Sequence, residues 1–189
     1  MRRRTFDKVM VAFGLVVMAV LIVAGSLLTW GSSFISSQVH SQLVAQKIYF
    51  PAAAAFAHPK PGTEITPSMI PSVSQYAGQE MTNGAQAEVY ANDFIAVHLQ
   101  EIGAGQTYAQ LSAKAIAEPT NTALANQVQL VFRGTTLRGL LLSTYAFWQM
   151  SQIAGDAALA SFLLAFVMLV LVALGIAHLR RTPPGEQLV

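Results

Sequence analysis

The residues best suited to chemistry are a histidine and a glutamate three positions apart, His98 and Glu101. Two side chains at that spacing are neighbours on one face of a helix, so the pair could bind a metal ion or move a proton. A metal site would need a third ligand, for which His40, Glu88 and Asp93 are candidates. The alternative is structural: on an apolar helix face, the imidazole of His98 hydrogen-bonds a carbonyl group or Glu101. We favour this alternative and expect neither a metal nor another cofactor.

No other catalytic pattern occurs in the chain. It contains no cysteine, which excludes disulfides, thiolate metal sites and cysteine nucleophiles. No serine lies in a Gly-x-Ser-x-Gly elbow, and there is neither a phosphate-binding loop nor a dinucleotide fingerprint. His58 lies in a proline-rich stretch and is expected to be a solvated loop residue. The sequence therefore predicts that the protein is not an enzyme.

The composition is that of a membrane protein. The chain is 53% hydrophobic and only 11% charged, whereas soluble domains are about 25% charged. A disordered charged tail would show the opposite balance. The formal net charge is only +2 and the basic residues concentrate near the two ends, so a nucleic-acid partner is not expected.

Two segments are long and apolar enough to cross a bilayer. Residues 9–30 and 157–177 carry no formal charge, and a span needs about 20 apolar residues. Basic residues flank both segments on their outer sides, and basic flanks stay in the cytoplasm. These membrane-flanking charges are Arg2, Arg3, Arg4, Lys8, Arg180 and Arg181. The pattern predicts a multi-pass protein of the plasma membrane with both termini cytoplasmic.

Two other interpretations of the N-terminus remain open. A cleaved secretory signal peptide would also begin with charge, but its apolar region is usually about 7–15 residues long. The stretch Arg3–Lys8 is similar to a twin-arginine export signal. A membrane anchor explains the same arginines without a receptor.

The predicted fold class is an all-α membrane protein, with two transmembrane helices flanking a small extracytoplasmic helical bundle. In this division, residues 1–8 are a cytoplasmic N-terminus, 9–30 the first span, 31–156 the extracytoplasmic domain, 157–177 the second span and 178–189 a cytoplasmic tail. Residues 51–80 hold five of the eight prolines and are expected to be irregular. A short strand is expected just before this segment, near residues 48–50.

Four helices are expected in the extracytoplasmic domain. The first continues from the span and ends before Pro51, with Ile35, Val39 and Leu43 on its apolar stripe. The fourth runs from about residue 121 into the second span. We do not expect residues 137–153 to form a third span, because they contain several polar residues.

The clearest amphipathic pattern covers residues 82–102. Thr82 or Asn83 can cap its start, Phe94 and Ile95 lie at the centre of its apolar stripe, and Gln86 lies off the stripe. A shorter helix is expected at residues 108–117, capped by Thr107 and followed by Pro119.

Two arginines lie on the otherwise apolar fourth helix. Arg133 and Arg138 could bind lipid headgroups at the outer membrane surface. We favour salt bridges inside the bundle, to Glu88, Asp93 or Glu101.

Several motifs carry a family resemblance. They include Gln42–Ile48, His98–Leu111 with its glycine pair and Thr-Tyr-Ala, and Leu137–Leu141. Through them the chain resembles a family of uncharacterised two-span membrane proteins from actinobacteria, which are often auto-labelled as aromatic ring-opening dioxygenases. Relative to the proteins of that family, the proline-rich segment at residues 51–80 looks like an insertion. Such dioxygenases hold iron with two histidines and one carboxylate, and the chain shows no compact cluster of that kind.

The predicted function is that of a non-enzymatic accessory, scaffold or assembly partner in the bacterial cell envelope. Its expected partners are the lipid bilayer and either another envelope membrane protein or a second copy of itself. One alternative is an extracytoplasmic sensor domain that acts through a partner, since residues 178–189 contain no output domain. The other is an envelope enzyme or metal site that uses His98 and Glu101.

Overall fold

The computed structural model describes residues 3–183, and every regular element in this range is a helix. Arg2 and residues 184–189 of the predicted tail lie outside it. The chain divides into two compact units. We call residues 3–34 with 150–183 the helix pair and residues 35–149 the central unit.

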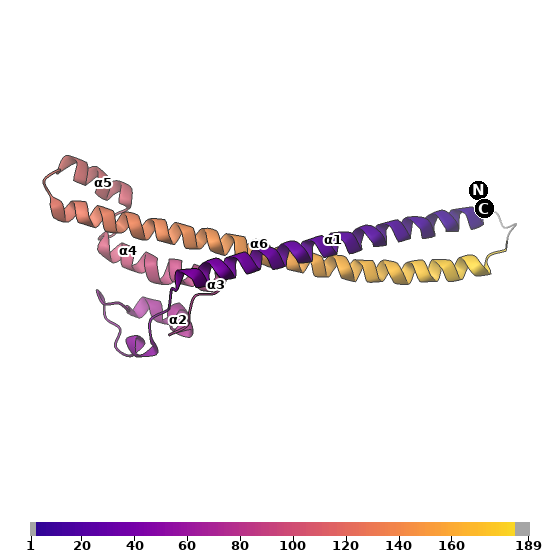
Figure 1. The fold of residues 1–189 in the computed structure, drawn as a ribbon, viewed down its shortest axis with the longest axis horizontal. Helices are drawn as coiled ribbons and strands as arrows, with labels where there is room; N and C mark the ends of the chain where they lie inside the picture. Colours follow the sequence, from indigo (N-terminus) through magenta and orange to yellow (C-terminus); the bar gives the residue numbers. More distant parts are fainter. Residues whose placement is uncertain (1–2, 184–189) are drawn as a thin grey trace. The chain divides into compact units, whose positions relative to one another are not determined.

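The helix pair consists of the first part of α1 (Arg3–Gln46) and the last part of α6 (Thr122–Arg181). These segments run side by side (Figure 1) and approach each other closely at glycines. A Cβ atom on Gly14 would lie 2.8 Å from Val172, and one on Gly25 would lie 3.0 Å from the ring of Phe162. The hydroxyl of Ser32 donates a 2.7 Å hydrogen bond to the backbone carbonyl of Ser151. The predicted pair of long apolar helices packed together is thereby confirmed.

Both helices are long and apolar enough to cross a membrane. Their most apolar stretches have mean hydropathies of 2.7 and 2.9, and only 11% of each stretch is buried within the protein. Large apolar side chains such as Phe13, Leu27 and Phe166 are exposed on the surface of the pair. Exposed apolar surface of this kind is typical of membrane or protein contact sites.

The central unit is built around one main apolar core. Val39 and Leu43 enter it from α1, and Leu141 enters it from α6. The remaining buried members are Phe50, Ile65, Met69, Val73, Met81, Ala87, Ala91 and Ile95. A second cluster, Leu111, Val128 and Val131, joins α5 (Tyr108–Ala117) to α6. The predicted stripe on the first helix is thus confirmed as a core face.

The proline-rich segment is more ordered than its composition predicts. It contains η1 (Ala53–Ala57), η2 (Pro67–Met69), α2 (Ile70–Val73) and η3 (Ser74–Tyr76). The expected strand near residues 48–50 is only an isolated bridge between Tyr49 and Glu80. Two backbone bonds beside it, Phe50 N–H to Gln79 and Met81 N–H to Ile48, close the segment into a loop with paired ends.

A π-helical turn interrupts the middle helix. The helix comprises α3 (Gly84–Val89), the turn η4 (Tyr90–Ile95) and α4 (Ala96–Ile102), and Asn83 caps its start. Ile95, at the centre of the predicted stripe, is buried together with Ala87 and Ala91, whereas Phe94, also at the predicted centre, is only half-buried. The prediction that Gln86 lies off the buried face is wrong, because its side chain is 5% exposed.

The remaining helices agree with the predicted pattern. Ala104 and Gly105, with φ of 48° and 75°, turn the chain after α4. Thr107 and Gln110 form a reciprocal capping box at the start of α5. α6 then continues from Thr122 to Arg181 without a break. This confirms one continuous helix that passes through residues 137–153 into the second apolar segment.

Candidate functional site

His98 turns back toward its own helix. Its Nδ1 lies 2.8 Å from the backbone carbonyl oxygen of Phe94, and its ring meets the Phe94 ring edge-on at 4.6 Å. Because a carbonyl oxygen only accepts, Nδ1 carries the proton and donates in this bond. The imidazole thus bonds a carbonyl group, as the structural alternative predicted. This bond uses Nδ1 and leaves Nε2 for other contacts.

Glu101 points to a different part of the central unit. Its carboxylate accepts a long hydrogen bond, 3.5 Å, from the backbone N–H of Gly62 in the proline-rich segment. His40, one candidate third ligand, lies 3.0 Å from the carbonyl oxygen of Thr82 through its Nδ1. Over residues 3–183 the structure brings together no group of three or more His, Asp or Glu side chains that could hold a metal ion.

A groove of about 350 Å³ lies beside His98, between the middle helix and α6. Its walls are apolar on both sides, with Leu99 and Ile102 on α4 and Leu130 and Leu137 on α6. Its polar side chains are His98 and Arg133, and no carboxylate lines it. Phe94, Ile95 and Gly134 complete the lining. The lining of the groove is thus mostly apolar, with two polar side chains.

Arg133 and Arg138 on α6 do not form the expected salt bridges. Arg138 instead donates a 2.8 Å hydrogen bond from Nη2 to the side-chain oxygen of Asn92, and its buried Nε has no acceptor. Arg133 is exposed at the groove. Within the described part of the chain, no ion pair joins either arginine to Glu88, Asp93 or Glu101. The positive charge of Arg133 is therefore available to a ligand.

Gln86 is a buried polar residue that the sequence interpretation placed off the buried face. Gln86 Oε1 accepts hydrogen bonds from the backbone N–H and the hydroxyl of Thr82, at 2.7 and 3.2 Å. Its Nε2 donates to Gln79 at 3.3 Å. The spacing Asn83-x-x-Gln86 matches a capping box, and this signal could have identified Gln86 as a structural residue.

Tyr90 brings a second polar group to the core. Its ring packs edge-on against Phe50 at 5.3 Å and is tilted against Phe94 at 4.7 Å. Burial raises the pKa of the Tyr90 phenol above its ordinary value, and the negative charge of Glu64 raises it further. The phenol is thus kept neutral and has the character of a core residue rather than of a general base.

The predicted membrane-flanking charges gather at one end of the helix pair. Arg3, Arg4 and Lys8 lie in the first turns of α1, and Arg180 and Arg181 lie in the last turn of α6. Asp7 and His178 connect the two helices at this end, with 3.9 Å between Oδ2 and Nε2. Arg2 lies outside the described residues. The two basic clusters therefore lie at the same end of the helix pair.

Comparison with known proteins assigns no relationship. No protein-family model, no curated protein and no solved structure matches the chain. Its function must be inferred from its own fold and side chains.

Proposed function

We propose that the chain is a non-enzymatic integral membrane protein of the bacterial cell envelope, which acts as an accessory or assembly partner of another envelope membrane protein. The helix pair is its membrane anchor, and the central unit is the part presented outside the cytoplasm. The observation that carries the proposal is an apolar surface on α6 within the central unit.

The exposure of the helix pair supports membrane placement. An apolar helix in the core of a soluble protein is mostly buried, whereas 89% of each apolar stretch here is unburied (100% minus the 11% buried). Exposing such a surface to water costs about 25 cal/mol per Å², so a bilayer is its favourable surrounding. The basic residues clustered at one end support a cytoplasmic location for that end.

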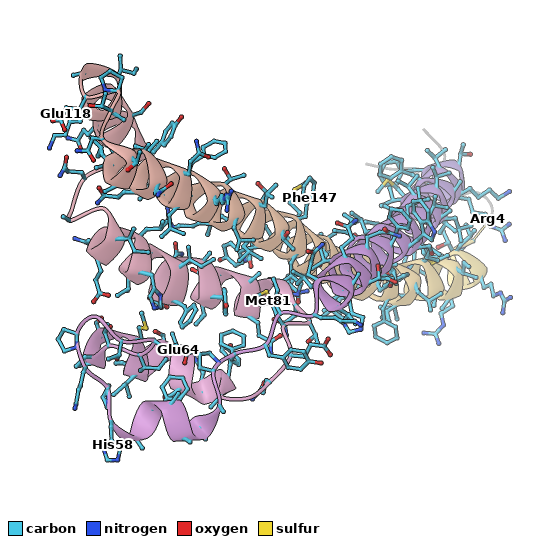
Figure 2. The ribbon with its side chains drawn as sticks, turned by 60° about the vertical axis from the view of Figure 1, so that its left-hand side comes forward. Arg4, His58, Glu64, Met81, Glu118 and Phe147 are labelled. Carbon is cyan, nitrogen blue, oxygen red and sulfur yellow. The ribbon has the colours of Figure 1, made fainter. Side chains whose placement is uncertain are left out.

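The apolar surface on α6 supports a protein partner. Leu140 is 63% exposed and Phe147 is 57% exposed, and their spacing of seven residues places both on one face of the helix. Figure 2 shows Phe147 projecting from α6 on the side away from α4. We call these two residues the α6 surface. Aromatic and large aliphatic side chains grouped in this way are typical of the core of a protein interface.

The enzyme alternative has less support. His98 bonds a carbonyl of its own helix and Glu101 contacts Gly62, so the two groups predicted to act together do not converge. We also propose that the chain is related to the actinobacterial two-span family that it resembles. That family has no established activity, which agrees with a non-enzymatic role.

Co-purification of the full-length protein tests the proposal. The tagged chain is purified in a mild detergent from cells that express it at native level, together with the double variant Leu140→Asn/Phe147→Ser. We expect a reproducible envelope protein to accompany the wild type and to be lost from the variant. The control is Ile116→Asn on α5, an isolated apolar residue that is 79% exposed, and it should retain the partner. A wild-type protein that is always recovered as a solitary monomer would contradict the proposal.

A further inference from the structure

We propose that the groove between the middle helix and α6 binds a long-chain carboxylate, with the alkyl chain between the leucine walls and the carboxylate at Arg133. This inference does not depend on the proposed function, because the groove and the α6 surface use different residues.

The shape and lining of the groove favour an alkyl chain. Its volume of about 350 Å³ lies at the small end of ligand sites, which are about 300–1,000 Å³, and this favours one chain over two. Leu130 and Leu137 are 51% and 40% exposed on its α6 wall. An alkyl chain would remove this apolar surface from water, and that removal is the main favourable term in binding such a ligand.

The two walls of the groove meet closely at a glycine. A Cβ atom at Gly134 would lie 2.5 Å from Cδ2 of Leu99, so the observed position of the Leu99 side chain depends on the absence of a side chain at residue 134. Both residues line the groove, so this close contact sets how near its α4 and α6 walls approach each other.

The positive charge at the groove favours a ligand with an anionic head group. Arg133 is its one permanently charged lining residue, and the lining contains no acid to neutralise it. A guanidinium group binds a carboxylate through two parallel hydrogen bonds. His98 adds a second polar atom, Nε2, because its Nδ1 is engaged with Phe94. Glu101 is the acidic residue nearest to His98 in the sequence. It does not line the groove, and its carboxylate contacts Gly62 instead. An anionic head group therefore fits better than a neutral or cationic one.

Photo-crosslinking of the full-length protein in lipid nanodiscs tests the proposal, because it identifies the site even when the probe also enters the bilayer. The probe is a palmitic acid carrying a diazirine in its chain, and labelled peptides are located by mass spectrometry. We expect labelling of peptides from residues 94–102 and 130–137. The same diazirine chain ending in an alcohol, and a lysophospholipid carrying it, serve as comparison probes.

Matched variants separate the chain contribution from the charge contribution. Leu137→Trp fills the groove and should abolish labelling by the acid and the alcohol, and Leu130→Trp provides an independent second filling variant. Ile116→Trp adds the same ring on α5, outside the groove and the α6 surface, and should leave labelling by both probes unchanged. Arg133→Gln should weaken labelling by the acid about fivefold, as expected for one exposed ion pair, without affecting labelling by the alcohol. Protease resistance of each variant shows that it is folded.

Four results would overturn the proposal. The first is groove labelling that persists in both filling variants while these remain protease-resistant. The second is an unchanged response of the acid probe to Arg133→Gln. The third is preferential labelling by the lysophospholipid, which would identify the groove as a phospholipid site. Absence of any labelling of the groove peptides in the wild type would refute binding altogether.

Discussion

Truncating Met69 to alanine is expected to destabilise the central unit by about 2–5 kcal/mol, the usual cost of removing a buried methionine side chain. Met69 is 0% exposed and lies in the main core with Ile65 and Val73, which are 2% and 0% exposed. Loss of a fully buried side chain accounts for about 1.5–3 kcal/mol, and the cavity left behind adds to it. The equilibrium constant for unfolding should therefore rise at least about 30-fold.

Pulse proteolysis of the full-length protein in nanodiscs measures this change. The fraction of the central unit that is cleaved is followed against urea concentration, and the midpoint gives the free energy of unfolding. The control is Lys60→Ala, an exposed residue of the same segment whose backbone N–H bond to Ile65 is retained. It should stay within about 0.5 kcal/mol of the wild type. If Met69→Ala and Lys60→Ala have the same urea midpoint, the proline-rich segment is not part of the core.

Three further predictions use the same assay. Gln86→Leu should cost about 1–3 kcal/mol, because the buried N–H of Thr82 loses its acceptor, and an unchanged midpoint would contradict the described network. Gly84→Ala should cost about 1–3 kcal/mol, because a Cβ atom there would lie 2.3 Å from the Cβ of Trp148; a neutral effect would mean that the two helices are farther apart. The raised pKa of Tyr90 makes the folded state hold its proton longer than the unfolded state, so stability should fall as pH rises above about 10. Tyr90→Phe should reduce this loss, and an identical pH profile would refute the assigned cause.

The helices were predictable because their signals are local. Thr107 and Gln110 form a capping box within four residues, and the apolar stripe of Val39 and Leu43 needs only helical spacing. The helix that leads through residues 137–153 into the second apolar segment was predicted because several polar residues argue against a third span there.

The features that sequence reasoning missed depend on tertiary contacts. A π-helical turn at Tyr90–Ile95 interrupts the predicted helix, and no residue type marks such a turn. Prolines indicate where a helix breaks, but they do not show that Ile65, Met69 and Val73 meet the core. Arg138 hydrogen-bonds the neutral side chain of Asn92 on another helix. Charge alone had favoured a salt bridge to a carboxylate, because the sequence does not show which side chain lies within reach.

The topology of the chain tests the proposed membrane role most directly. Because the protein has no cysteine, single cysteines can be introduced by Thr5→Cys in α1, His58→Cys in the proline-rich segment and Gln187→Cys, which lies outside the described residues. Intact cells are treated with a membrane-impermeant thiol reagent, and permeabilised cells show that each thiol can react. Two spans with cytoplasmic termini predict labelling at position 58 only. Labelling at position 5 or 187 in intact cells, or protection at position 58, would contradict the proposed membrane arrangement.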